Sequence, residues 1–108
     1  MRTIETEQVL DIIKPIPSDK FIKNRFLGND GESCVLGHIY RTICDNNISI
    51  GIISSIRRLS KDYLEKKCNI FHTDITSIND RSDIKGYTQD DIKTRVVKLL
   101  EDMIENGY

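Results

Sequence analysis

An apolar stripe near the C-terminus requires a helix that packs against a core. Six apolar side chains recur there at helical spacing: Ile92, Val96, Leu99, Leu100, Met103 and Ile104. A helix of about four turns is marginal by itself in water, so this stripe has to be buried against other parts of the chain. Thr88 followed by Asp91 predicts a capping box at the start of the helix, and Gly107 predicts its end.

Similar spacing of apolar residues predicts three earlier helices, over residues 3–13, 34–44 and 49–67. Their candidate N-caps are Thr3 or Thr6, Ser33 and Ser49. The prolines of "KPIPSD" end the first helix, because proline lacks a backbone N–H and biases the preceding residue toward extended geometry.

Two further segments are extended in character. "KFIKNRFLG" at residues 20–28 is short and aromatic-flanked, and "NIFHTDITSIND" at residues 69–80 is rich in β-branched residues without clean alternation. The predicted fold class is therefore α+β, mainly α, with four helices around one core. The extended segments leave open a small two-stranded antiparallel sheet. We expect a single domain over residues 1–108, near the commonest domain size.

The charge balance and the cysteines narrow the classes of function. The net charge is −1 and both signs are spread along the chain, which argues against a nucleic-acid partner. No apolar run approaches the ~20 residues of a membrane span, and the acidic N-terminus does not resemble a signal peptide. The odd cysteine count, without paired spacing, argues against a disulfide framework. We expect a cytoplasmic protein without membrane contact.

The stretch "CVLGHIYR" at residues 34–41 contains the main candidate site. A helical projection puts its apolar residues on one face and three other residues together on the opposite side: Cys34, His38 and Arg41. Gly37 lies beside that side, and a glycine inside a helix costs about 1 kcal/mol relative to alanine. We therefore expect another element or a ligand to approach the backbone at Gly37.

One interpretation of this face is a cysteine-dependent hydrolase or transferase. Cys34 lies in the first turn of a helix, where the positive end of the dipole increases the thiolate fraction. His38 is one turn away, and His72 followed by Asn79 or Asp80 has the chain order of the base and orienting residue in papain-type enzymes. We favour the simpler interpretation that Cys34 is a small buried hydrophobe, as free cysteines usually are.

A zinc site is another interpretation of the same residues. The spacing C-x-x-x-H occurs twice, in Cys34 with His38 and in Cys68 with His72, and a Cys2His2 set suits zinc. Structural zinc sites favour C-x-x-C spacing, so we expect two unrelated buried cysteines, two surface histidines and no cofactor.

Basic residues on the third expected helix are weak candidates for a binding surface. Arg57, Arg58 and Lys61, together with Arg41, could meet an acidic protein surface or a phosphate backbone. A solvated helix face is the ordinary explanation of such a pattern, and we favour it.

Three blocks of the sequence resemble a family of small uncharacterised proteins from bacteria and their phages. The blocks are "GESCVLGHIYR", "INDR" and "GYTQDDIKTRVVKLLEDMIENGY", and the resemblance spans residues 18–108. Ser33 stands where many relatives carry a second cysteine. The resemblance implies a small, soluble, intracellular, α-rich domain, often encoded on phage or mobile DNA, and it implies no reaction. The residues that match its recurring blocks are Cys34, Gly37, His38, Asn79, Asp80 and Tyr87.

These matching residues suggest a contact within the chain. We expect the segment at residues 79–80 to dock by hydrogen bonds onto the backbone near Gly37. For function, we expect a non-enzymatic interaction or accessory protein of phage or mobile-element origin that binds another protein in the cytoplasm of a bacterial cell or phage-infected host. The hydrolase and the zinc-stabilised module are the alternatives, and the oligomeric state stays open.

Overall fold

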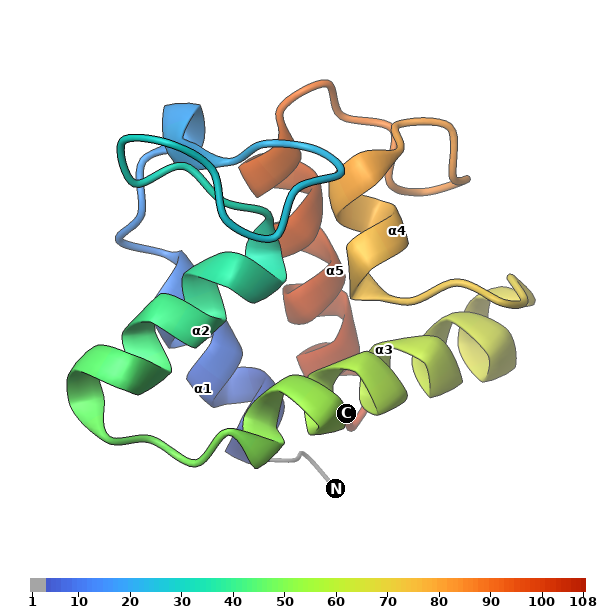
Figure 1. Ribbon diagram of the computed structural model, residues 1–108. Helices are drawn as coiled ribbons and strands as arrows, with labels where there is room; N and C mark the ends of the chain where they lie inside the picture. Colours follow the sequence, from blue (N-terminus) through green and yellow to red (C-terminus); the bar gives the residue numbers. More distant parts are fainter. Residues whose placement is uncertain (1–3) are drawn as a thin grey trace.

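The computed structural model describes residues 4–108, which form helices joined by irregular segments (Figure 1). The elements are α1 (Ile4–Ile13), the short 3-10 helix η1 (Ser18–Lys20), α2 (Val35–Asn46), α3 (Gly51–Cys68), α4 (Ile75–Asp80) and α5 (Ile92–Glu105). The four predicted helices are present as α1, α2, α3 and α5. None of the helices in the described part of the chain is long and apolar enough to cross a membrane.

Helix α5 occupies the centre of the fold. It packs against α1 on one side and α4 on the other, while α3 crosses the lower ends of α1 and α5 (Figure 1). Val96, Leu99, Leu100 and Met103 are fully buried, as the apolar stripe predicted. The buried apolar side chains of the helices join into one core cluster, which is what makes the short helices stable.

The predicted starts of α2 and α5 are wrong by one and three residues. The N-cap of α2 is Cys34 instead of Ser33, and Cys34 makes no capping hydrogen bond with its side chain. The N-cap of α5 is Asp91, whose carboxylate accepts a hydrogen bond of 2.9 Å from the N–H of Thr94. Thr88 therefore does not cap α5. An aspartate can fill the capping position as well as a threonine, so the pattern allowed both registers.

The other predicted N-caps also differ from the structure. Ile50 is the N-cap of α3, and the Ser49 hydroxyl accepts a 3.3 Å hydrogen bond from the N–H of Gly51. Thr6 lies inside α1, where its hydroxyl donates to the backbone oxygen of Tyr108 at 2.5 Å. The alternative cap Thr3 lies outside the described residues.

Helix α4 replaces part of a segment that was predicted to be extended. Asp74 is its N-cap: the carboxylate accepts from the N–H of Thr76 at 2.8 Å, and the Ser77 hydroxyl accepts from the N–H of Asp74 at 3.5 Å. Ile75 and Ile78, one turn apart, are fully buried. The β-branched residues of this segment disfavour an isolated helix. Packing against α5 therefore stabilises α4.

The small two-stranded sheet does not form in residues 4–108, where the β-type pairing is limited to isolated bridges. In the first extended segment, Phe21 and Leu27 each bridge to Ser33. Asn24, between them, has a left-handed φ of 57°. A residue in that region turns the chain, so the extended run is too short to build a ladder.

Candidate functional site

An irregular segment at residues 21–34, which we call the 21–34 loop, connects η1 to α2 and lies over the N-terminal end of α2 (Figure 1). Backbone hydrogen bonds close it on itself: Ile22 N–H donates to Ser33 O at 3.0 Å, and Gly28 N–H donates to Glu32 O at 2.8 Å. Ordered irregular loops of more than about 12 residues are uncommon in compact domains and are often functional.

At Gly37 of α2 the loop comes very close to the helix. A Cβ atom at this position would lie 1.7 Å from the carbonyl oxygen of Phe26 and 2.7 Å from the Cβ of Ser33. Only glycine allows the backbone of the loop to approach this closely. The expectation of an approaching element at Gly37 is therefore confirmed, and that element is the loop.

His38 is packed beneath the same loop. Its imidazole Nε2 lies 2.7 Å from the backbone oxygen of Lys20, and its ring centroid lies 4.5 Å from that of Phe21. Only 4% of the residue is exposed, so the expectation of a surface histidine is wrong. Burial lowers the pKa of His38 and nearby Arg41 lowers it further, against the opposing effect of the hydrogen bond to Lys20. Because the carbonyl oxygen of Lys20 can only accept, Nε2 of His38 is the donor of this hydrogen bond.

Arg41, one turn further along α2, points at the loop. Its Nε donates to the hydroxyl of Ser33 at 2.9 Å, and its Nη2 lies 3.4 Å from Gly28 O and 3.3 Å from Glu32 O. The guanidinium thus holds both sides of the loop. These hydrogen bonds explain why an arginine lies at this position. They do so better than the prediction that Arg41 belongs to a surface for an acidic partner.

The end of α4 holds the loop from the other side. Asn79 Oδ1 accepts from the N–H of Val35 at 2.9 Å, and its Nδ2 donates to Ile22 O at 2.9 Å. The Asp80 carboxylate accepts from the N–H of Asn24 at 2.9 Å. The expectation that residues 79–80 dock near Gly37 is confirmed, since Val35 lies two residues before it. Asn79 also supplies the cap that Cys34 does not provide, because it satisfies one of the free N–H groups at the start of α2.

Arg95 holds Asn79 in place, although no sequence motif predicted it as a site residue. It is fully buried, and its guanidinium donates to Ile78 O at 2.5 Å and to Asn79 O at 2.6 Å. Two further donations reach Gln89 O at 2.9 Å and Asp90 O at 3.0 Å. One signal was available: a charged residue lies three positions after Ile92 and so falls on the apolar stripe of α5.

The predicted catalytic residues do not pair with one another as a nucleophile and base, although Asn79 and Asp80 lie near the start of α2. Cys34 is half-buried, and its Sγ lies 4.0 Å from Phe26 O instead of pairing with a histidine. The Nε2 of His38 is taken up by Lys20, and Asn79 and Asp80 hold backbone groups. His72 is exposed in a separate hollow, between α3 and the start of α4. No observation therefore favours a thiol hydrolase or transferase.

The candidate zinc ligands Cys34, His38, Cys68 and His72 do not converge either. Within residues 4–108, no three His, Cys, Asp or Glu side chains are grouped closely enough to hold a metal ion. Cys34 and Cys68 are half-buried free thiols, and Cys44 is exposed.

The basic residues of α3 lie on the surface. Arg57, Arg58 and Lys61 are exposed, and Arg57 forms an ion pair of 3.1 Å with Asp74. Arg57, Lys61 and His72 line one polar hollow. An exposed charged helix face is what we expected here, and exposed ion pairs of this kind contribute little to stability.

The 21–34 loop exposes two large apolar side chains. Phe26 is 44% exposed and Leu27 is 45% exposed. The ring centroid of Phe26 lies 5.5 Å from that of Tyr40 on α2, so the helix supports the exposed ring. No family model, curated protein or solved structure matches the chain. The ordered loop with its exposed Phe26 and Leu27 is therefore the feature that points to a function.

Proposed function

We propose that this protein acts by binding another protein, as a non-enzymatic accessory factor, and that the 21–34 loop is its binding surface. The supporting observation is that Asn79, Asp80 and Arg41 hold an irregular loop on which Phe26 and Leu27 are exposed. Loops held on a rigid scaffold commonly carry binding residues, and aromatic side chains are enriched at the centres of protein interfaces. A loop ordered before binding also loses less entropy when the partner arrives.

The proposed function needs no metal or cofactor. The sequence motifs that resemble those of small bacterial and phage proteins support an origin in a phage or mobile element, and the partner is then a protein of the phage or of its bacterial host. The resemblance to that family stays a prediction.

The test compares the partners of two variants with those of the wild-type protein. Phe26→Ser combined with Leu27→Ser removes the exposed side chains of the loop. Phe71→Ser is the matched control, because Phe71 is 53% exposed after the end of α3. All three forms are used to capture proteins from a lysate of the native host, and each captured protein is then purified and titrated directly. Unchanged thermal unfolding shows that the variants are folded.

We expect at least one purified partner to bind the wild-type protein and the Phe71→Ser variant equally. The double variant is expected to bind it about tenfold or more weakly, because an exposed aromatic anchor commonly dominates the affinity of an interface. Equal binding of every captured protein to the double variant would contradict the assignment of the loop as the binding surface.

A further inference from the structure

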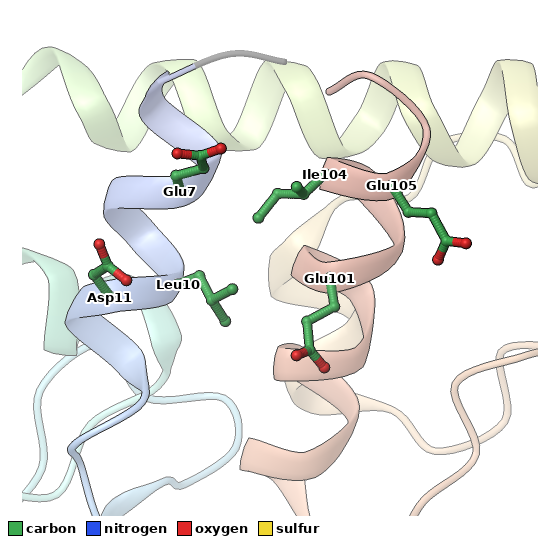
Figure 2. A pocket seen from close by; sticks show the side chains of 6 residues that line it. All are labelled: Glu7, Leu10, Asp11, Glu101, Ile104 and Glu105. Carbon is green, nitrogen blue, oxygen red and sulfur yellow. The ribbon is translucent and has the colours of Figure 1, made fainter. Parts of the chain in front are cut away.

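A groove between α1 and α5 lies on residues separate from the 21–34 loop. Figure 2 shows Leu10 of α1 and Ile104 of α5 pointing toward one another across the groove. Four acidic residues also line the groove, Glu7, Asp11, Glu101 and Glu105, and Figure 2 shows that the Glu105 side chain points away from α1. The groove thus combines a short apolar strip with carboxylates that come from both helices.

Three of the four acidic residues at the groove carry a charge that no basic side chain of residues 4–108 pairs with. These three residues are Asp11, Glu101 and Glu105. Asp11 and Glu101 are exposed, one on each helix. The carboxylates are also too far apart to hold a metal ion, since they form no group of three in the described part of the chain. A ligand for this groove therefore needs several positive charges at a distance from one another.

The spacing of the acidic residues matches a helical ligand. Glu7 and Asp11 are four residues apart on α1, and Glu101 and Glu105 are four residues apart on α5. Residues at this spacing lie on one face of a helix, about 6 Å apart along its axis. A third helix lying in the groove would present side chains at the same rise, with apolar residues toward Leu10 and Ile104 and basic residues on both flanks.

We infer that the α1–α5 groove binds a basic amphipathic helix of a partner protein, with an apolar stripe between two rows of lysine or arginine. The apolar stripe covers Leu10 and Ile104. The flanking basic side chains pair with Asp11 on one side and Glu101 on the other. Because this surface differs from the loop, its occupancy does not depend on the proposed function of the loop.

The probe is a synthetic amphipathic peptide of about 18 residues, long enough to form a helix, with leucines on one face and lysines on both flanks. Its affinity for the full-length protein is measured by fluorescence anisotropy, and its position by amide chemical shifts. Two control peptides carry glutamate in place of the lysines or serine in place of the leucines. The lysine peptide is expected to shift amides of α1 and α5, and both control peptides are expected to bind at least about tenfold more weakly.

Two charge-reversal variants separate binding of the lysine peptide in the groove from non-specific electrostatic attraction of the peptide to other acidic residues. Asp11→Lys with Glu101→Lys reverses charge on both sides of the groove. Asp45→Lys with Glu65→Lys makes the same change in net charge at exposed positions on α2 and α3. The groove variant is expected to lose about tenfold or more in affinity for the lysine peptide, and the control variant to lose less than about twofold.

Three results would overturn the inference. The first is equal weakening by both variants, which indicates non-specific attraction. The second is a peptide footprint on the 21–34 loop instead of α1 and α5. The third is a concentration-dependent dimer in sedimentation that Asp11→Lys with Glu101→Lys abolishes, which makes a second copy of the chain the occupant.

Discussion

Asn79 Oδ1 accepts a 2.9 Å hydrogen bond from the backbone N–H of Val35, which lies 44 residues earlier in the chain. This contact joins the end of α4 to the start of α2. Helix starts leave several N–H groups without partners, and a side chain from the same segment usually satisfies one of them. Here the partner comes from another helix, so the start of α2, the 21–34 loop and α4 are held as one unit.

Replacing Gly37 by alanine is expected to destabilise the protein, although alanine favours helices. The new Cβ would lie 1.7 Å from the carbonyl oxygen of Phe26, so the loop backbone has to move. We expect a net loss of about 2 kcal/mol, because the steric conflict exceeds the gain of about 1 kcal/mol in helix propensity. Thermal unfolding measures the loss, and amide shifts locate it in the 21–34 loop.

Gly51→Ala is the matched control for this change. A Cβ on Gly51 would have Ser49 Oγ as its nearest neighbour at 3.4 Å, which is an ordinary contact. That variant is expected to be neutral or more stable by up to about 1 kcal/mol. A Gly37→Ala protein as stable as Gly51→Ala would show that the loop does not need its close approach to α2.

Asn79→Ala is expected to lower the free energy of unfolding by about 2–4 kcal/mol. The change leaves the N–H of Val35 and the carbonyl of Ile22 without their partner, and buried polar groups without a partner cost about 1–3 kcal/mol each. Denaturant titration gives the value. Asn46→Ala removes an exposed amide that donates to Thr42 O and is expected to change stability by less than about 0.5 kcal/mol. A similar small loss for both variants would show that the hydrogen bonds of Asn79 do not stabilise the fold.

Arg95→Met is expected to destabilise the protein by about 3 kcal/mol. Methionine fills a similar volume but leaves the carbonyls of Ile78 and Asn79 without donors. Arg58→Met, at an exposed position of α3, is the control and is expected to stay within about 0.5 kcal/mol of the wild type.

The double variant of Arg95→Met and Asn79→Ala tests whether the two residues act together. Because Arg95 positions the backbone of Asn79, the combined loss should be smaller than the sum by about 1 kcal/mol or more. Additive losses would mean that the two residues stabilise the fold independently.

His38 is expected to make stability depend on pH. Its folded-state pKa lies below the ordinary value of 6.5 because the imidazole is buried. As pH falls below 6.5, the unfolded chain takes up the proton first, so stability is lost until the pH passes the folded pKa. Unfolding measured between about pH 5 and 6.5, above the range where most carboxylates titrate, should show this decrease.

The two histidines provide the control for the pH prediction. His38→Gln keeps a donor for Lys20 O but cannot titrate, so its stability should be flat over that pH range. His72→Gln, at an exposed position, should retain the decrease. The reverse pattern would assign the pH dependence to His72.

The native cysteines are expected to differ in their rates of alkylation. Cys44 is exposed, whereas Cys34 and Cys68 are half-buried, so Cys44 should react first and the three rates should converge on unfolding. Peptide mass spectrometry after timed alkylation measures each rate. Fast reaction of Cys34 alone at neutral pH would indicate an activated thiolate and would restore the hydrolase as a candidate.

The local patterns of the sequence predicted the helices better than the connections between them. The apolar stripe at Val96 and Leu99 predicted α5, since the spacing of a stripe follows from helix geometry alone. Ile75 and Ile78 belong to a helix too short for such a stripe, and its stability comes from packing against α5. Because glycine lowers helix stability, Gly37 predicted that another group approaches the backbone there. The sequence did not predict that this group is the carbonyl of Phe26.

The sequence by itself determined four helices, an apolar face on each, and a group of unusual residues on the second helix. Tertiary structure decided what that group does. The partners of His38, Arg41 and Asn79 are mainly backbone atoms, which belong to η1, the 21–34 loop and the start of α2. Every residue carries the same backbone N–H and C=O groups, so no sequence pattern can mark which of them a buried side chain will meet. Those contacts exist only once α2, α4 and α5 are packed together.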